Sequence, residues 1–329
     1  MTSLSSSRFM PPSFAIAALL FAAFLGVTAS YAAAQPQTSA NSSENSPLQQ
    51  RIHDQLAALQ QPGGSDRNVA SQWALVGAEY LEAADFPNSE NAYSHSIQLL
   101  RKNPADASLY AEALDQLGTL YRIYDRLSEA VNCRRNALAV RQRLGDPLPI
   151  ARSESHLAEL DLMARKYKEA FTGADAAYQT MTRLADKDKA EILSTLIVRA
   201  YAQCGLHHRS ACLADAKEAL ALSRSAFASQ SQPVGAALVA LGSAQLKNGS
   251  AAEAEASTEQ ALDIFKSQLV SSDPRMIFAM QQYRDCLRAL HHDEEAHDIS
   301  TQLSTMSRQA GRPCPTCTVS VYGLRSTTP

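Results

Sequence analysis

The sequence predicts an all-α fold, an α-solenoid of about six antiparallel helix pairs, and three observations support this. Glycine and proline are scarce, at 13 and 14 of 329 residues, or about 8% against roughly 12% in average proteins. Small residues recur every 40 to 42 positions over most of the chain. The six prolines within residues 65–310 fall in expected turns or between pairs, where they interrupt no helix. A β-sandwich or barrel needs far more turn residues, so this class is disfavoured.

The first 34 residues are expected to be a secretory signal peptide. Arg8 is the only charged side chain before residue 44, and residues 14–27 form an apolar run of 14. Ala32-Ala33-Ala34 then provides a small-residue cleavage site. The run is shorter than the roughly 20 residues that cross a bilayer as a helix, with an uncleaved anchor as the alternative. We therefore expect export to the periplasm or the extracellular space, with no transmembrane segment in the mature chain.

Two short segments are expected to precede the helix pairs. Residues 35–47 are rich in Ser, Asn and Gln, which predicts a disordered linker. Residues 48–64 predict a short helix that a Pro-Gly-Gly sequence stops. Such an amphipathic helix can cap the first pair, because four apolar side chains fall on one of its faces: Leu48, Ile52, Leu56 and Leu59.

Residues 65–310 divide by self-similarity into six units. A small residue opens the second helix of each unit, at spacings of 41, 40, 42, 42 and 42: Ser89, Ala130, Ala170, Cys212, Ala254 and Ala296. Twelve positions before each of them stand Gly77, Gly118, Ala158, Ala200, Gly242 and Arg284. Two antiparallel helices approach closely only where small side chains face each other. Because one pair cannot bury its apolar face alone, successive pairs are expected to stack.

These units resemble tetratricopeptide repeats (TPRs). The family pattern W-x2-L-G-x2-Y is matched in the first unit by Trp73, Val76, Gly77 and Tyr80. The second unit matches it with Leu114, Leu117, Gly118 and Tyr121, and the fifth with Leu238, Leu241 and Gly242. The other three units depart more, and the spacing exceeds the family's 34 residues, as in the longer repeats of kinesin light chains. The resemblance implies a right-handed α-solenoid that binds other proteins and is not an enzyme.

The resemblance also implies a concave groove, lined by the first helix of each pair, that binds an extended peptide or a partner protein. Mixed charges argue against a groove dedicated to one acidic or basic tail. Carried over by position, the candidate groove residues are Glu112, Asp115, Thr119, Arg122, Arg152, Ser155, Glu159, Tyr201, Ser243, Lys247, Gln281, Asp285 and Arg288.

Six cysteines lie after the expected cleavage site, an even number that permits disulfides in an exported protein. Cys204 and Cys212 flank the turn of the fourth unit, where they can pair or act as small packing residues. Cys314 and Cys317 form a C-P-T-C motif in the tail, residues 311–329. This motif fits a structural disulfide or an idle tail, and it also supports the alternative function of a thiol–disulfide or metal-handling protein.

No other pattern predicts an enzyme, a cofactor or a metal site. The pairs His207-His208 and His291-His292 lie 84 residues apart, in the same turn of different units, so they cannot share a metal. Nucleotide-binding and nucleophile motifs such as GxxxxGK[ST], GxGxxG and GxSxG are missing. The net charge of −3 is spread over 30 basic and 33 acidic residues, which disfavours nucleic acid as a partner. We expect a non-enzymatic scaffold with a protein or peptide partner.

Overall fold

The fold is all-α over the residues that the computed structural model describes, 47–60, 64–184, 188–271 and 273–309. A first helix, α2 (Pro47–Leu59), precedes six pairs, and a short 3₁₀ helix (Pro104–Asp106) lies between the first two pairs. The pairs are α3 (Asp66–Glu82) with α4 (Phe86–Leu100), α5 (Ala107–Ile123) with α6 (Leu127–Leu144), α7 (Pro147–Met163) with α8 (Tyr167–Arg183), α9 (Lys189–Gly205) with α10 (Arg209–Ala226), α11 (Gln232–Lys247) with α12 (Ala251–Lys266), and α13 (Pro274–Ala289) with α14 (Asp293–Gln309).

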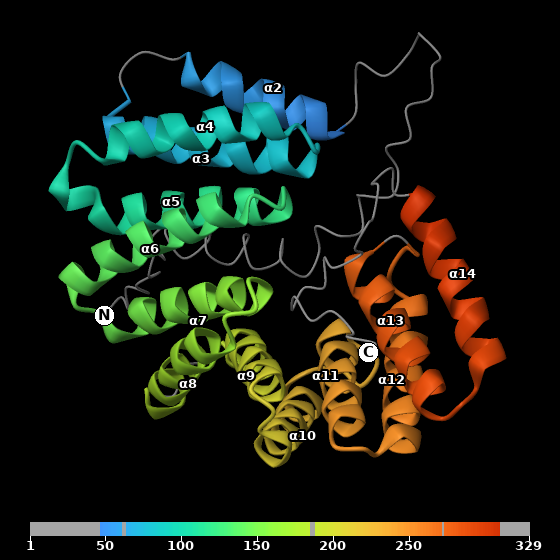
Figure 1. Ribbon diagram of the computed structural model, residues 1–329. Coiled ribbons are helices and arrows are strands. Elements are labelled where there is room, and N and C mark those ends of the chain that lie inside the picture. The colour runs from blue at the N-terminus through green and yellow to red at the C-terminus, as the bar shows by residue number, and fades with distance from the viewer. Residues whose placement is uncertain (1–46, 61–63, 185–187, 272, 310–329) are drawn as a thin grey trace, which may run out of the picture.

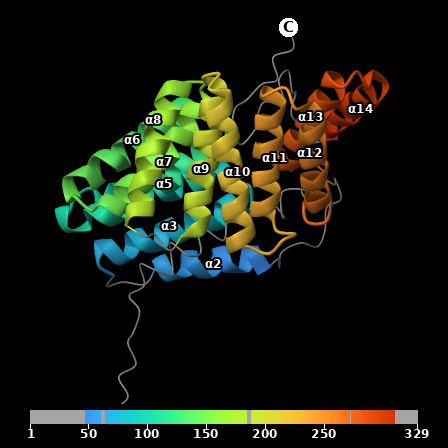
Figure 2. The same ribbon diagram turned by 90° about the horizontal axis from the view of Figure 1, so that it is seen from below.

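The thirteen described α-helices pack in consecutive order, which confirms the predicted solenoid of antiparallel pairs. Each helix packs against the next one along the chain, from α2 on α3 to α13 on α14. Figure 1 shows the pairs following one another along an arc, from α3 and α4 to α13 and α14. Seen from below, α9, α10, α11 and α12 stand side by side (Figure 2). No described helix is both long enough and apolar enough to cross a membrane.

Prolines and capping side chains mark the helix starts. Pro87 is the second residue of α4, and α7, α11 and α13 likewise have proline in their first turn. This position suits proline because the first N–H groups of a helix have no partner within it. Asp85 and Asp273 cap α4 and α13 by accepting hydrogen bonds from backbone N–H groups of the first turn, at 3.3 and 2.8 Å.

All six turns within the pairs share one backbone geometry. The residue five positions before the small residue that opens each second helix adopts a left-handed conformation: Ala84, Asp125, Arg165, His207, Gly249 and His291. In each turn the next N–H donates to a carbonyl five residues earlier, at 2.8–3.0 Å. This is the Schellman arrangement, which usually places glycine at the left-handed residue. Here Gly249 alone among these six is glycine, and φ at the other five is 57–62°.

The small residues of the repeat pattern lie at the contact between paired helices, as predicted. Those that open the second helices are at most 2% exposed: Ser89, Ala130, Ala170, Cys212, Ala254 and Ala296. Their partners on the first helices allow a close approach. A Cβ atom at Gly77, for example, would lie 2.8 Å from the ring of Tyr93.

The apolar core differs between the two halves of the array. A single cluster of buried side chains runs from Ala158 in α7 to Leu303 in α14, whereas the earlier pairs are held by several smaller clusters. At the centre of the large cluster is α11, in which 11 of 16 residues are buried. It contacts α9, α10, α12 and α13, because its Gly, Ala and Ser residues let these helices approach closely.

The segments outside the six pairs are described only in part. Helix α2 begins at Pro47 and packs on α3, where Arg51 pairs with Glu79 at 2.9 Å and also with Glu82. The expected signal peptide (1–34), the linker up to residue 46 and the tail from residue 311 lie outside the described residues.

Candidate interaction surface

The first helices of the pairs form the inner layer of the arc. From the third pair onward, successive first helices contact each other directly, α7 with α9, α9 with α11 and α11 with α13. Each second helix packs instead between the first helix of its own pair and that of the next. Figure 1 shows α8, α10 and α14 on the outer side of this layer. Every candidate groove residue lies on a first helix, so the inner layer is where their side chains must be located.

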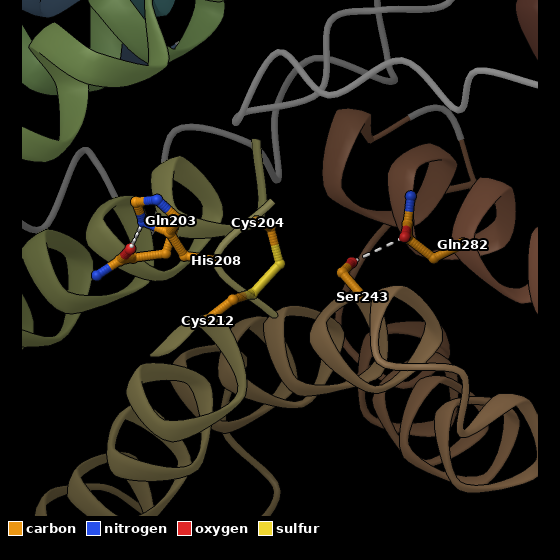
Figure 3. The surroundings of a disulfide bond; sticks show 6 residues. All are labelled: Gln203, Cys204, His208, Cys212, Ser243 and Gln282. Atoms are coloured by element: carbon orange, nitrogen blue, oxygen red, sulfur yellow. Dashed lines mark hydrogen bonds between the residues drawn. A yellow bond between two sulfur atoms is a disulfide. The ribbon is translucent and has the colours of Figure 1, made fainter. Parts of the chain in front are cut away.

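Four of the candidate groove residues are buried: Ser155, Glu159, Tyr201 and Ser243, at 1–8% exposure. Three of them join neighbouring first helices. The Ser155 hydroxyl lies 2.6 Å from that of Thr195, Glu159 pairs with Arg122 at 3.9 Å, and Ser243 donates to the Gln282 amide oxygen at 2.7 Å (Figure 3). These side chains join neighbouring first helices to each other, and partner contact through them stays a prediction.

Tyr201 links two pairs that are not neighbours along the chain. Its ring meets the ring of Phe278 edge-on, with centroids 6.0 Å apart, so α9 of the fourth pair touches α13 of the sixth. The small side chains of α11, which lies between them, leave room for this contact. Side chains therefore fill the inner layer at this point of the fourth to sixth pairs.

Asp115 and Thr119 belong to a buried polar network between the second and third pairs. Asp115 pairs with Arg134 at 3.1 Å and with Arg141, which also bonds Ser153, and Arg134 donates to the Thr119 hydroxyl at 2.7 Å. Burial alone would raise the pKa of Asp115, but the adjacent arginines outweigh it and hold this pKa below its usual value. Asp115 therefore remains charged, and its charge is already matched within the fold.

The same network continues into the fourth pair through His156. Arg134 lies 2.8 Å from Nδ1 of His156, whose Nε2 is 3.3 Å from the carboxylate of Glu191 at the start of α9. Burial would raise the pKa of Glu191, but contact with His156 and the positive charges of Arg152 and Arg134 lower it on balance. Sequence reasoning missed this network, because its members come from four different helices.

The remaining candidates differ in exposure, and partner contact through them stays a prediction. Lys247 and Arg288 are exposed, whereas Glu112, Arg122, Arg152, Gln281 and Asp285 are partly buried. Asp285 pairs with Arg284 at 2.8 Å and lies 3.9 Å from Arg288. Burial raises the pKa of Glu112, and Arg141 opposes this shift.

Cys204 and Cys212 form a disulfide across the turn between α9 and α10 (Figure 3), one of the two possibilities that the sequence left open. Their Cα atoms are 5.1 Å apart, and both side chains are buried. Cys133 and Cys286 are free and buried, and burial raises their pKa to about 11 and about 12. Such thiols react slowly. Cys314 and Cys317 lie outside the described residues.

The two histidines next to the disulfide are part of the turn between α9 and α10. His207 holds the left-handed position, and Nδ1 of His208 lies 2.8 Å from the amide oxygen of Gln203 (Figure 3). Over the described ranges, no three residues among His, Cys, Asp and Glu are grouped so that they could hold a metal ion.

Solved structures with similar folds have low sequence identity to this chain. A Rap protein complexed with competence and sporulation factor matches with a TM-score of 0.62 at 13% identity, over 80% of this chain and 70% of that one. BtubC from P. vanneervenii matches with a TM-score of 0.57 at 17% identity, over 68% of this chain and 92% of that one. The apo form of the quorum sensor NprR from B. thuringiensis matches with a TM-score of 0.57 at 15% identity, over 79% of this chain and 71% of that one. Together with the paired helices, these likenesses establish a TPR-like solenoid fold.

Searches by sequence find no relative. No family model matches the chain, and no curated protein matches it. The comparisons therefore concern the fold alone.

Proposed function

We propose that this chain, whose fold is a TPR-like solenoid, is a non-enzymatic scaffold that binds a protein or peptide partner along its inner layer, outside the cytoplasm. Folds of this kind present a curved surface to other proteins. The observation that carries the proposal is the row of charged side chains on neighbouring first helices, Glu112 and Arg122 on α5 with Arg152 on α7. They are partly exposed and of both signs, which suits a polar peptide backbone and its mixed side chains.

The distribution of burial favours the second and third pairs as the binding region. In the fourth to sixth pairs, Tyr201 and Ser243 are turned into the core and Tyr201 meets Phe278. A partner there would reach exposed residues near helix ends, such as Lys247 and Arg288. A partner on α5 and α7 would reach Glu112 and Arg152, which lie within their helices, together with Arg122 in the last turn of α5.

Two observations support a location outside the cytoplasm. The Cys204–Cys212 disulfide is a bond typical of oxidising compartments. The first 34 residues have the charge, apolar run and small-residue triplet of a secretory signal peptide.

Affinity capture from an envelope or secreted fraction tests the proposal. The baits are residues 35–329, the variant Arg122→Glu/Arg152→Glu, and Lys217→Glu as a control on an exposed lysine of α10. We expect a partner that the first and third baits recover and the second loses, with all three baits showing the same helical circular dichroism spectrum. Recovery of the same proteins by all three baits would exclude the inner layer of pairs two and three.

A further inference from the structure

The turns within the pairs follow one another along one edge of the array. All six share one backbone geometry, and the pairs that contain them stack in consecutive order. The turns of the third and fourth pairs lie against each other, because the ring of Tyr167 at the start of α8 fills the space beside Gly205 at the end of α9. We call this side of the molecule, made of the six turns and the helix ends next to them, the turn edge.

The turn edge is basic at the third and fourth pairs. Four exposed cations lie there, against one exposed carboxylate, that of Glu169. Among these cations, Lys166 forms the one ion pair found within the described ranges, at 3.9 Å with the buried Asp161. Arg165 donates to the hydroxyl of Tyr167 at 3.1 Å, which leaves its charge unmatched. We name the four cations the basic segment: Arg165, Lys166, Lys168 and Arg209.

The turn edge is acidic at the fifth and sixth pairs. Five carboxylates lie near the starts of α12 and α14, four of them exposed, and none has an ion pair within the described part of the chain. Lys247 and Arg288 are exposed cations at the ends of α11 and α13, so negative charge prevails there without being fully neutralised. We name the five carboxylates the acidic segment: Glu253, Glu255, Asp293, Glu294 and Glu295.

Carboxylates of α12 and α14 gather around one side chain of α13. Burial raises the pKa of Tyr283, and the negative charges of Glu259, Glu255 and Glu295 raise it further. The packing of the fifth pair on the sixth therefore brings like charges from two helices close together. A positively charged surface placed against the acidic segment would relieve their repulsion.

The order of charge makes the turn edge complementary to itself. Two basic pairs precede two acidic pairs along the chain. A two-fold rotation about an axis between the fourth and fifth pairs would set the third pair of one copy against the sixth of the other, and the fourth against the fifth. Each basic segment then meets an acidic segment, and the contact forms twice, as a symmetric interface requires. An anionic partner that spans the whole edge would instead be repelled by the acidic segment.

We propose that the turn edge is the interface of a symmetric dimer of this chain, in which the basic segment of each copy binds the acidic segment of the other. The inference goes beyond the proposed function, which assigns a different partner to the inner layer. Glu112, Arg122 and Arg152 of the inner layer belong to neither segment. The dimer therefore presents two inner layers, and a partner with two binding segments gains avidity from engaging both.

Analytical ultracentrifugation of residues 35–329 tests the proposal. We expect the mass to rise with concentration to twice that of the monomer and to stay there. Because salt shortens the Debye length from about 10 Å at 0.1 M to about 3 Å at 1 M, the higher salt concentration should weaken the dimer at least about fivefold. A chain that stays monomeric up to about 0.1 mM, or a mass that grows beyond the dimer, would overturn the proposal.

Charge-reversed variants locate the interface. The basic-segment variant is Lys166→Glu/Lys168→Glu/Arg209→Glu, and the acidic-segment variant is Glu253→Lys/Glu294→Lys/Glu295→Lys. Each alone should dimerise at least about tenfold more weakly than the wild type. An equimolar mixture should form the dimer again, because the turn edge is now acidic throughout in one variant and basic throughout in the other.

The matched control reverses three exposed arginines at the opposite ends of the second helices, Arg143→Glu/Arg183→Glu/Arg224→Glu. It should dimerise like the wild type. Circular dichroism checks that every variant is folded. If the two segment variants are folded and still dimerise, or if their mixture stays monomeric, the pairing of the two segments is refuted. A monomeric wild type that binds vesicles of anionic lipid through the basic segment would equally refute it, with a membrane surface as the occupant.

The inner-layer variant separates this inference from the proposed function. Arg122→Glu/Arg152→Glu should dimerise like the wild type, although it loses the partner of the inner layer. A monomeric inner-layer variant would show that the interface includes the inner layer, and would contradict a dimer through the turn edge. Failure of partner capture with an intact dimer would count against the proposed function alone.

Discussion

The hydroxyl of Ser89 donates a 2.7 Å hydrogen bond to the carbonyl oxygen of Gly77, twelve residues earlier in the chain. Both residues are buried where α3 and α4 cross. The spacing of twelve links the two pattern positions of each unit, both of them small in five of the six units, and here it is visible as a direct contact between paired helices. Side-chain volume at these positions therefore sets how closely a pair can pack.

Gly77→Ala should destabilise the protein although alanine favours helix by about 1 kcal/mol. The new Cβ would lie 2.8 Å from the ring of Tyr93, which is 1% exposed and has little room to move. We expect a net loss of about 1–2 kcal/mol in urea unfolding. Gly118→Ala is the control, because its nearest neighbours are 3.3 Å away and include the side chain of Arg134. An equal loss in both variants would refute a role for the Tyr93 contact.

Glycine at the left-handed turn positions should stabilise the chain. Ala84 and Arg165 have φ of 57° and 60°, a conformation that costs L-residues about 1–2 kcal/mol. Part of this gain is offset by the greater chain entropy of glycine in the unfolded state. We expect Ala84→Gly and Arg165→Gly each to raise the free energy of unfolding by about 0.5–1 kcal/mol. Ala164→Gly, one residue before Arg165 with φ of −77°, should instead lower it, and a gain there would contradict the explanation.

Loss of the disulfide should lower stability without changing the fold. The bond closes a loop between residues eight apart, for which chain entropy predicts a contribution of about 2–3 kcal/mol. Because the other five turns have the same geometry without a disulfide, Cys204→Ala/Cys212→Ala should keep its helical circular dichroism spectrum. A reducing agent should lower the melting temperature of the wild type and leave the variant unchanged. A wild type that melts at the same temperature when reduced would disprove this contribution.

The polar network should make stability depend on acid pH. The pKa values of Asp115 and Glu191 are lowered in the folded protein, so their stabilisation is present above the unfolded values near 4 and is lost as pH falls through the lower folded values. Asp115→Asn should cost roughly 3 kcal/mol at pH 7, because it leaves Arg134 and Arg141 without their buried partner. The difference from wild type should shrink below about pH 4. Asp263→Asn, at a side chain 70% exposed, should show neither effect.

The sequence predicts the architecture well because small residues at fixed spacing are themselves the packing contacts. The inner-layer side chains were harder to place. Position on a first helix identifies Ser155 and Tyr201 as inward residues, but whether they face a partner or a neighbouring helix depends on how tightly the array curves. The left-handed turns were also hidden, since only Gly249 carries the usual residue. The polar network around Asp115 and Arg134 joins residues 15 to 26 positions apart, for which no local pattern exists.

The contact between Tyr201 and Phe278 bears on how this chain could have changed in length. Arrays in which each repeat touches only its neighbours can gain or lose whole repeats, because every junction resembles the next. Here the fifth pair lies between two pairs that also touch each other through these rings. If the fifth pair were deleted, Tyr201 and Phe278 would lie on adjacent pairs. The spacing between their rings would then differ from the one that the present contact requires. Insertions and deletions of a pair are therefore expected near the first two pairs, whose apolar clusters are small and separate.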